Sequence, residues 1–363
     1  MKKSQIILLS LVLVTILAVL GCAAPAPSSP PSTTPATTTS PEPAAKPISI
    51  KLAYSMPPTS PAGVAFEWWA DEVEKRSDGK VVVDTYAGGS LVKSPEDVNA
   101  LRDGITQVGF INLVAYSKNF PVSNVFDLPN FNFPDTKAGW TAAIAAHRQL
   151  IAKYKTLQDE FAGMTNVFWF PLPSSMIAST KLVKAPSDLK GMKIGCSSIN
   201  MDIIDAAGGT PVYVVPPNMY DQIQKSTING GVIGWNHVFA HKLQEVCTNF
   251  LEQYFGQEIT TCFMMDKFFN SLPADVQKII KDVNEEANVM AVDKMLELSD
   301  KGRQLAVDAK RTITKPTAAE AAQWEQVCKV TNDKWLADVN SLGIKDAQQI
   351  MDDLKKLRDA AWK

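Results

Sequence analysis

The sequence predicts an α/β protein with two lobes, and three observations support this fold class. Short apolar segments alternate with amphipathic segments and turns between residues 186 and 235, as in a βαβ-type unit with a parallel sheet. A similar alternation runs from residue 48 to residue 111. The chain has 363 residues, and the part from Ile48 onward is longer than a single hydrophobic core usually supports.

These two regions predict specific strands and helices. The N-terminal strand must end before Pro57, because proline lacks the N–H group that a strand ladder needs. The helix after it places Phe66, Trp69 and Val73 on one face. We expect, in order, strand 48–54, helix 62–76, strand 81–86, helix 95–102 and strand 108–111, and then strand 192–196, helix 199–207, strand 211–215 and helix 219–227.

Longer apolar patterns predict the remaining elements. The apolar strand 166–170 is followed by two prolines, and we expect it to cross between the lobes. A long helix begins at Ser271, since serine is a good N-cap and the nearby proline is tolerated in a first turn. Its apolar residues recur at helical spacing up to Gly302. Two further helices, 318–342 and 347–362, are expected to pack against the second lobe.

The N-terminus has the pattern of a secretory signal. Two lysines precede a short apolar run that ends at Gly21, which predicts a signal peptide at 1–21. The cysteine that follows resembles the one in a bacterial lipobox, which implies lipidation of Cys22. Residues 22–47 are rich in Pro, Thr and Ala and predict a disordered tether. The alternative is a permanent membrane anchor, because the apolar run is only slightly shorter than the ~20 residues of a spanning helix.

Composition narrows the function classes. The formal charge of −2 and the 20% of charged residues give no indication of nucleic-acid binding. No second long apolar run is present. Four cysteines beyond Cys22 allow two disulfides in three pairings, but their wide spacing in a large domain favours free, buried thiols. They are Cys196, Cys247, Cys262 and Cys328.

Several short motifs follow one another along the chain. In the second lobe they are DLKGMKIG at 188–195, AGGTPV at 207–212, YDQIQ at 220–224 and ING at 228–230, followed by Trp235. In the first lobe they are GITQVG at 104–109 and FDLPNF at 126–131. These motifs resemble, in order, those of the solute receptors of TRAP transporters (tripartite ATP-independent periplasmic transporters). The resemblance covers most of the mature chain, with Asn229 standing where the family's turn has Asp.

The resemblance implies a two-lobed periplasmic binding protein fold of type II-like form, with a long helix that spans both lobes. We expect residues 48–170 with about 262–300 in lobe I, and residues 171–261 with about 301–363 in lobe II. It implies a receptor, not an enzyme, without cofactors, outside the cytoplasm in the periplasm or at the outer face of the membrane. Its partners would be one small organic solute, the TRAP permease subunits and the lipid of its anchor, but no nucleic acid.

The family's two carboxylate-binding arginines are both missing from this sequence. Gly195 stands where the family has the strand arginine, and Ser174 and Ser175 stand where the other is expected. An arginine holds a carboxylate through two parallel hydrogen bonds, each worth about 1.5–3 kcal/mol. We therefore expect a neutral, aromatic or otherwise unusual ligand, although an organic acid stays possible if Arg102 or Arg148 supplies charge.

The candidate ligand-binding residues come from two arguments. Ligands in open α/β sheets bind beyond the carboxyl ends of the strands, which selects residues after the first-lobe strands. Aromatic side chains and the family positions select the others, and Gly195 is expected to leave room in the pocket floor. The candidates are Ser55, Met56, Phe110, Asn112, Trp169, Phe170, Ser174, Ser175, Gly195, Cys196, Tyr213, Tyr220, Trp235 and Asn236.

Two other function classes were weighed. His237 and His241 are four residues apart and share a helix face, a spacing that zinc sites use, so a metal-ion receptor is the alternative function. The sequence between them lacks the glutamate of a zinc protease, and no third ligand follows from spacing. Cys196 lies at a strand end where a nucleophile can sit, but no motif supplies a base, and no phosphate-binding or dinucleotide motif is present.

Overall fold

The computed structural model describes residues 46–93 and 96–363. The predicted signal peptide, the lipidation of Cys22 and nearly all of the predicted tether lie outside these described residues. Within them, no helix has the length and apolar character required to cross a membrane. All four cysteines beyond Cys22 are free and buried, as predicted.

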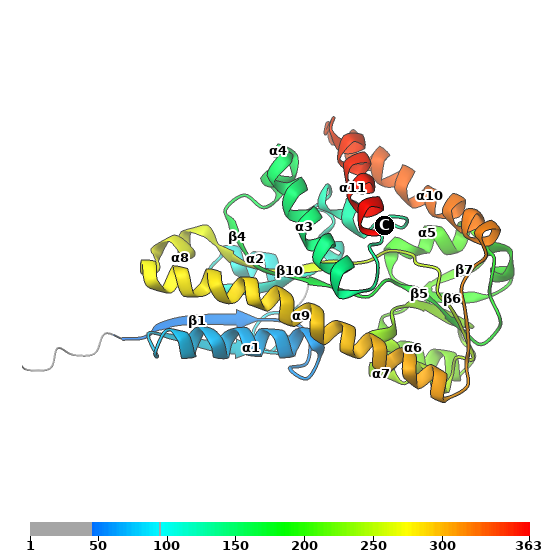
Figure 1. Cartoon of the computed structure of the whole chain (residues 1–363), viewed down its shortest axis with the longest axis horizontal. Coiled ribbons are helices and arrows are strands. Elements are labelled where there is room, and N and C mark those ends of the chain that lie inside the picture. The colour runs from blue at the N-terminus through cyan, green and yellow to red at the C-terminus, as the bar shows by residue number, and fades with distance from the viewer. Residues whose placement is uncertain (1–45, 94–95) are drawn as a thin grey trace, which may run out of the picture. The chain divides into compact units, whose positions relative to one another are not determined.

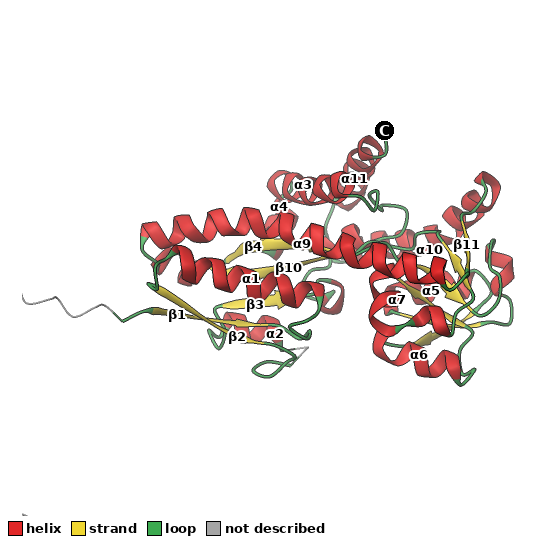
Figure 2. Cartoon of the chain, turned by 60° about the horizontal axis from the view of Figure 1, so that its bottom comes forward, coloured by secondary structure: helices red, strands yellow, loops and turns green. Residues whose placement is uncertain are grey.

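Five strands form the first sheet, in the order β2-β1-β3-β10-β4. The predicted strands β1, β2 and β3 are parallel, whereas β10 runs antiparallel to both of its neighbours. The bounds are β1 Ile48–Ala53, β2 Val81–Tyr86, β3 Val108–Ile111, β4 Met164–Pro171 and β10 Ile259–Met265. β10 was not predicted, and it connects β4 to the parallel part of the sheet (Figure 2).

Six strands form the second sheet, in the order β11-β9-β5-β8-β6-β7. β6 lies between β7 and β8 and is parallel to both, which confirms the predicted βαβ-type unit. β5 is antiparallel to β8 and β9. The bounds are β5 Met176–Ser179, β6 Lys193–Cys196, β7 Thr210–Tyr213, β8 Gly230–Ile233, β9 Asn249–Leu251 and β11 Thr312–Thr314.

The helices agree with the predicted order, with shifts at their ends. The helix predicted at 219–227 begins earlier, because Val215 is its N-cap and two prolines occupy its first turn. It ends before Ser226, whose φ of 55° lies in the left-handed region. The bounds are α1 Pro61–Arg76, α2 Asp97–Arg102, α3 Lys137–Lys153, α4 Lys155–Glu160, α5 Ser198–Ala206, α6 Pro216–Gln224, α7 Trp235–His241, α8 Asp266–Ser271, α9 Ala274–Asp308, α10 Ala318–Ser341 and α11 Ala347–Ala361.

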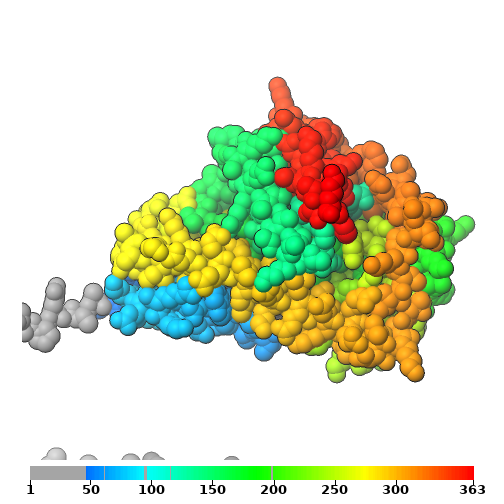
Figure 3. Space-filling model, in the orientation of Figure 1, coloured from blue at the N-terminus to red at the C-terminus, as the bar shows by residue number. Residues whose placement is uncertain are grey.

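The long helix α9 has 35 residues and contacts elements of both sheets. It packs against helix α1 and strand β4 of the first sheet, and against helix α7 and strand β11 of the second sheet. Figures 1 and 3 show it crossing one side of the molecule. Gly302 does not end this helix as its sequence suggested. A Cβ atom there would lie 1.9 Å from the carbonyl oxygen of Trp235, so this glycine permits the close approach of α7.

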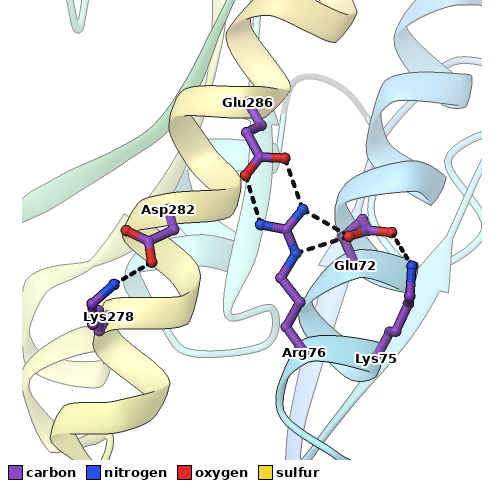
Figure 4. A network of polar contacts seen from close by, with 6 residues as sticks. All are labelled: Glu72, Lys75, Arg76, Lys278, Asp282 and Glu286. Carbon is purple, nitrogen blue, oxygen red and sulfur yellow. Dashed lines mark hydrogen bonds and ion pairs between the residues drawn. The ribbon is translucent and has the colours of Figure 1, made fainter.

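Charged side chains also join α9 to α1. The guanidinium of Arg76 donates to both carboxylate oxygens of Glu286 at 2.6 and 2.7 Å, and its Nε donates to Glu72 at 2.8 Å (Figure 4). Lys75 pairs with Glu72, and Lys278 pairs with Asp282 on the same surface. Each charge in this network therefore has an opposite partner.

The two C-terminal helices do not both pack as expected. Trp324 and Cys328 of α10 belong to a core of the second sheet, but Trp335 of the same helix belongs to the first-sheet core. The apolar face of α11, with Ile350 and Leu354, packs against α3 and lies in the first-sheet core. The expectation that both helices pack on the second lobe is therefore wrong for α11, because its apolar stripe packs against α3 (Figure 1).

Candidate ligand-binding site

A cavity of about 420 Å³ lies where parallel strands of both sheets end. Ser55 follows β1, Asn112 follows β3, Ser197 follows β6 and Gly234 follows β8, and all four line the cavity. Met295 of α9 lines it as well. Open α/β sheets bind ligands at this end of their strands, and the volume suits a small organic molecule.

Half of the predicted candidates line this cavity. Most of them lie in or shortly after a strand, Ser175 lies just before β5, and Asn236 lies at the start of α7. Whether they contact a ligand stays a prediction. They are Ser55, Met56, Phe110, Asn112, Phe170, Ser175 and Asn236.

The aromatic candidates are mostly elsewhere. Phe170 lines the cavity, so its neighbour Trp169 points to the opposite face of β4, where it packs with Phe161 and Phe263. Trp235 is 5% exposed and stacks on Phe250 with ring centroids 5.0 Å apart. These tryptophans are core residues and do not form walls of the cavity.

The tyrosine and cysteine candidates also lie outside the cavity lining. Tyr213 is 65% exposed at the end of the edge strand β7. The hydroxyl of Tyr220 donates to Glu245 on the surface. Cys196 is fully buried in a core of the second sheet, and burial raises the pKa of its thiol to about 11. A thiol in that environment is a structural side chain.

Two further candidates, Ser174 and Gly195, lie in hydrogen-bonded or packed parts of the protein and not in the cavity lining. The backbone N–H of Ser174 and its hydroxyl both donate to Asp135, and the amide of Asn132 donates to the same hydroxyl. A Cβ atom at Gly195 would lie 2.9 Å from Cδ1 of Ile228 and 3.3 Å from Cβ of Val214. Gly195 therefore leaves no extra room in the pocket floor, contrary to the expectation, because these core side chains fill the space.

Glu258 is the main cavity residue that the sequence analysis missed. It immediately precedes β10, and its side chain lines the cavity together with Thr260 of that strand. Because β10 is antiparallel, its first residues lie at the carboxyl ends of the parallel strands. Only knowledge of the strand direction could have identified this position from the sequence.

The electrostatics of the cavity are dominated by carboxyl groups. The amide of Asn112 donates to Oε2 of Glu258 at 3.2 Å, and the buried Asp127 accepts from the backbone N–H of Ile259 at 3.2 Å. Burial raises the pKa of Glu258, and burial together with the charge of Glu258 raises the pKa of Asp127. Among the described residues, no lysine or arginine lines the cavity.

The basic residues considered from sequence lie elsewhere. Arg148 forms a bidentate ion pair with Glu285 on the surface, and Arg102 lines a different hollow beside Phe268. His237 lines the cavity, and burial, with a smaller effect of His241, lowers its pKa to about 4. At neutral pH this imidazole is therefore uncharged.

The two histidines proposed as metal ligands lie on one helix, α7, as their spacing suggested. Their rings stack nearly parallel, with centroids 5.7 Å apart and an interplanar angle of 7°. Throughout the described ranges 46–93 and 96–363, no group of three or more His, Cys, Asp or Glu side chains is arranged to hold a metal ion. The geometry supplies no third ligand beside this pair.

Comparison with known proteins assigns the chain to a family. Residues 52–338 match the model of the bacterial extracellular solute-binding protein family 7. A C4-dicarboxylate-binding periplasmic protein of Rhodobacter capsulatus is 27% identical over 296 residues, which cover 80% of this chain and 87% of that protein. A protein of the same description from Vibrio cholerae is 24% identical over 289 residues, covering 77% of this chain and 84% of its own.

Solved structures give the same result. A TRAP periplasmic solute-binding protein from Desulfovibrio salexigens has a TM-score of 0.78 at 26% identity, covering 86% of this chain and 96% of its own. A TRAP solute-binding protein from Rhodoferax ferrireducens, solved with copurified benzoate, has a TM-score of 0.74 at 23% identity, covering 87% and 98%. The two-lobed fold is thereby confirmed. The chain belongs to the bacterial extracellular solute-binding protein family 7 and is a TRAP transporter solute-binding protein.

Proposed function

We propose that this TRAP solute-binding protein binds a small organic solute that is not acidic, in the cavity between the two sheets. The observation that supports this most strongly is the charge of the cavity lining. It contains the carboxyl group of Glu258 and no lysine or arginine among the described residues. Its other walls are largely apolar, with Met56, Phe110 and Phe170.

An acidic solute fits this lining poorly. A buried carboxylate needs a cation or several hydrogen-bond donors to offset its lost hydration. The neighbouring Glu258 and Asp127 are carboxyl groups and supply no positive charge that could offset it. Similar proteins have been solved with benzoate and with succinate, so the proposal rests on the residues of this cavity and not on the fold.

The proposed mechanism is closure of two lobes on the solute. Residues 48–170 with about 262–300 form lobe I, and residues 171–261 with about 301–363 form lobe II, except that β10 of the first sheet already begins at Ile259 and α11 packs with the first-sheet core. A solute stabilises the closed form only through its higher affinity for that form. The residues that line the cavity from both sheets, such as Asn112 and Asn236, provide that differential contact.

The closed receptor then delivers its solute to the membrane subunits of a TRAP permease, and a lipid on Cys22 holds it at the outer face of the membrane. The support is the N-terminal sequence pattern, with a basic start, an apolar run and Gly21 before the cysteine. Mass spectrometry of the mature N-terminus tests the anchor directly. A diacylated cysteine at position 22 is the expected result, and an unmodified N-terminus at another residue would contradict it.

Native mass spectrometry of the protein purified from its source tests the solute class. Denaturing release then identifies the bound molecule. A neutral or basic organic molecule is the expected result. A plain carboxylic acid would contradict the proposal, and an apoprotein that is stabilised only by zinc would favour the metal-receptor alternative based on His237 and His241.

A further inference from the structure

The backbone at Glu258 is fixed by hydrogen bonds at the cavity wall. The backbone N–H of Leu172 donates to the carbonyl oxygen of Glu258 at 2.8 Å, and the next residue, Ile259, donates its N–H to Asp127. Glu258 is therefore fixed on both sides at the end of the first sheet. Groups held by backbone hydrogen bonds of a sheet can recognise a ligand without a large ordering cost.

The cavity presents a hydrogen-bond acceptor that the protein leaves unused. In the described part of the chain, Oε2 of Glu258 accepts from Asn112, but no hydrogen bond reaches Oε1. Asn236 lines the same cavity, but its Oδ1 is fully buried and does not open onto the cavity. Oε1 of Glu258 is therefore the acceptor that a ligand's donor group can pair with.

Among the described residues, no cationic side chain lines the cavity beside Glu258. Asp127 is buried behind the cavity wall, and its Oδ2 has no hydrogen-bond partner within the described ranges. His237, the other ionisable side chain of the lining, is uncharged at neutral pH. A positive charge placed in the cavity would thus meet a carboxyl group without competition from a protein cation.

We propose that the solute is an organic ammonium ion whose N–H groups pair with the carboxylate of Glu258. This inference rests on the proposed function and narrows its solute class. The ammonium group occupies the polar end of the cavity, and the hydrocarbon part lies against Phe110 and Phe170. Charge-assisted hydrogen bonds of this kind are about twice as strong as neutral ones.

Two probes of the same size and opposite charge test the inference. We would measure thermal unfolding of the full-length protein with benzylammonium and with benzoate at equal, millimolar concentrations. Benzylammonium is expected to raise the Tm by several degrees, and benzoate is not, because ligand binding to the folded state alone stabilises it. Stabilisation by benzoate alone, or by neither probe, would overturn the inference.

Two variants assign the effect to the proposed group. Glu258→Gln keeps the shape and the hydrogen bond to Asn112 but removes the charge, and it should weaken benzylammonium binding roughly 10- to 100-fold. The control, Glu245→Gln, removes a surface carboxylate outside the cavity and should bind as the parent protein does. Equal affinity of Glu258→Gln and the parent would contradict the assignment.

The outcome for the natural solute separates this inference from the proposed function. A neutral solute released from the purified protein would refute the ammonium assignment and leave the non-acidic receptor intact. An acidic solute would refute both. A solute with a basic nitrogen, lost on Glu258→Gln substitution, would support both.

Discussion

Carboxyl groups on the α1–α9 surface and beside the cavity differ in their partners and in the direction of their pKa shifts. On the surface, Glu72 and Glu286 share the guanidinium of Arg76, and the pKa of each carboxyl group is lowered by hydrogen bonds to basic side chains. At the cavity, Glu258 and the Asp127 buried behind it have no basic partner among the described residues, and burial raises their pKa values. Carboxyl groups thus have basic partners on the α1–α9 surface and lack them beside the cavity.

The largest effect on stability is expected from substitution of Gly302, which allows α7 to pack closely against α9. A Gly302→Leu substitution places a side chain against the backbone of Trp235, and relief requires movement of α7 with Asn236 and His237. We expect a loss of about 3 kcal/mol or more in the free energy of unfolding, because the obstacle is backbone. Urea unfolding measures it, with Asp300→Leu on the exposed side of α9 as the control. Unchanged stability would show that the packing of α7 on α9 is loose.

A smaller effect of opposite sign is expected at the buried carboxyl group. Asp127→Asn retains an oxygen that can accept from the backbone N–H of Ile259, but it removes the cost of an ionised group beside Glu258. The folded-state pKa of Asp127 is raised, so its ionisation destabilises the protein as pH rises above the unfolded value near 4. We therefore expect Asp127→Asn to be more stable by at least about 1 kcal/mol at pH 8, with the gain shrinking toward pH 4.

Thermal unfolding of both proteins across this pH range measures the difference. A gain in stability that is constant with pH would mean that the pKa of Asp127 is the same in the folded and the unfolded protein. A loss of stability at pH 8 would mean that the carboxylate is compensated by a donor group, which would weaken the contrast between the cavity and the α1–α9 surface.

The smallest effect is expected on the charged surface itself. Arg76→Gln breaks the pairing with Glu286, but Arg76 is about one-third exposed and Glu286 is half exposed, so solvent screens the lost attraction. We expect the Tm to fall by no more than about 2 °C at low salt and less in 1 M NaCl. A fall of ten degrees would show that this network holds α9 in place more strongly than its exposure suggests.

The parallel strands were predictable because their apolar runs end at glycine and proline turns, and the cavity residues that follow them were predictable for the same reason. Glu258 was not, because a sequence does not reveal that the strand after it runs antiparallel. Phe170 and Trp169 are equally apolar, and only the register of β4 against β10 decides which of them faces the cavity. Gly302 resembled a helix end in the sequence, because glycine occurs both at helix ends and where two helices approach closely.

A crystal structure of the protein with the solute that copurifies from its source tests the central claim most directly. The account predicts a basic nitrogen about 2.7–2.9 Å from a carboxylate oxygen of Glu258, the length of a charge-assisted hydrogen bond. Its hydrocarbon part should lie against Phe110 and Phe170. A solute carboxylate in the same cavity, or a solute without contact to Glu258, would contradict the account.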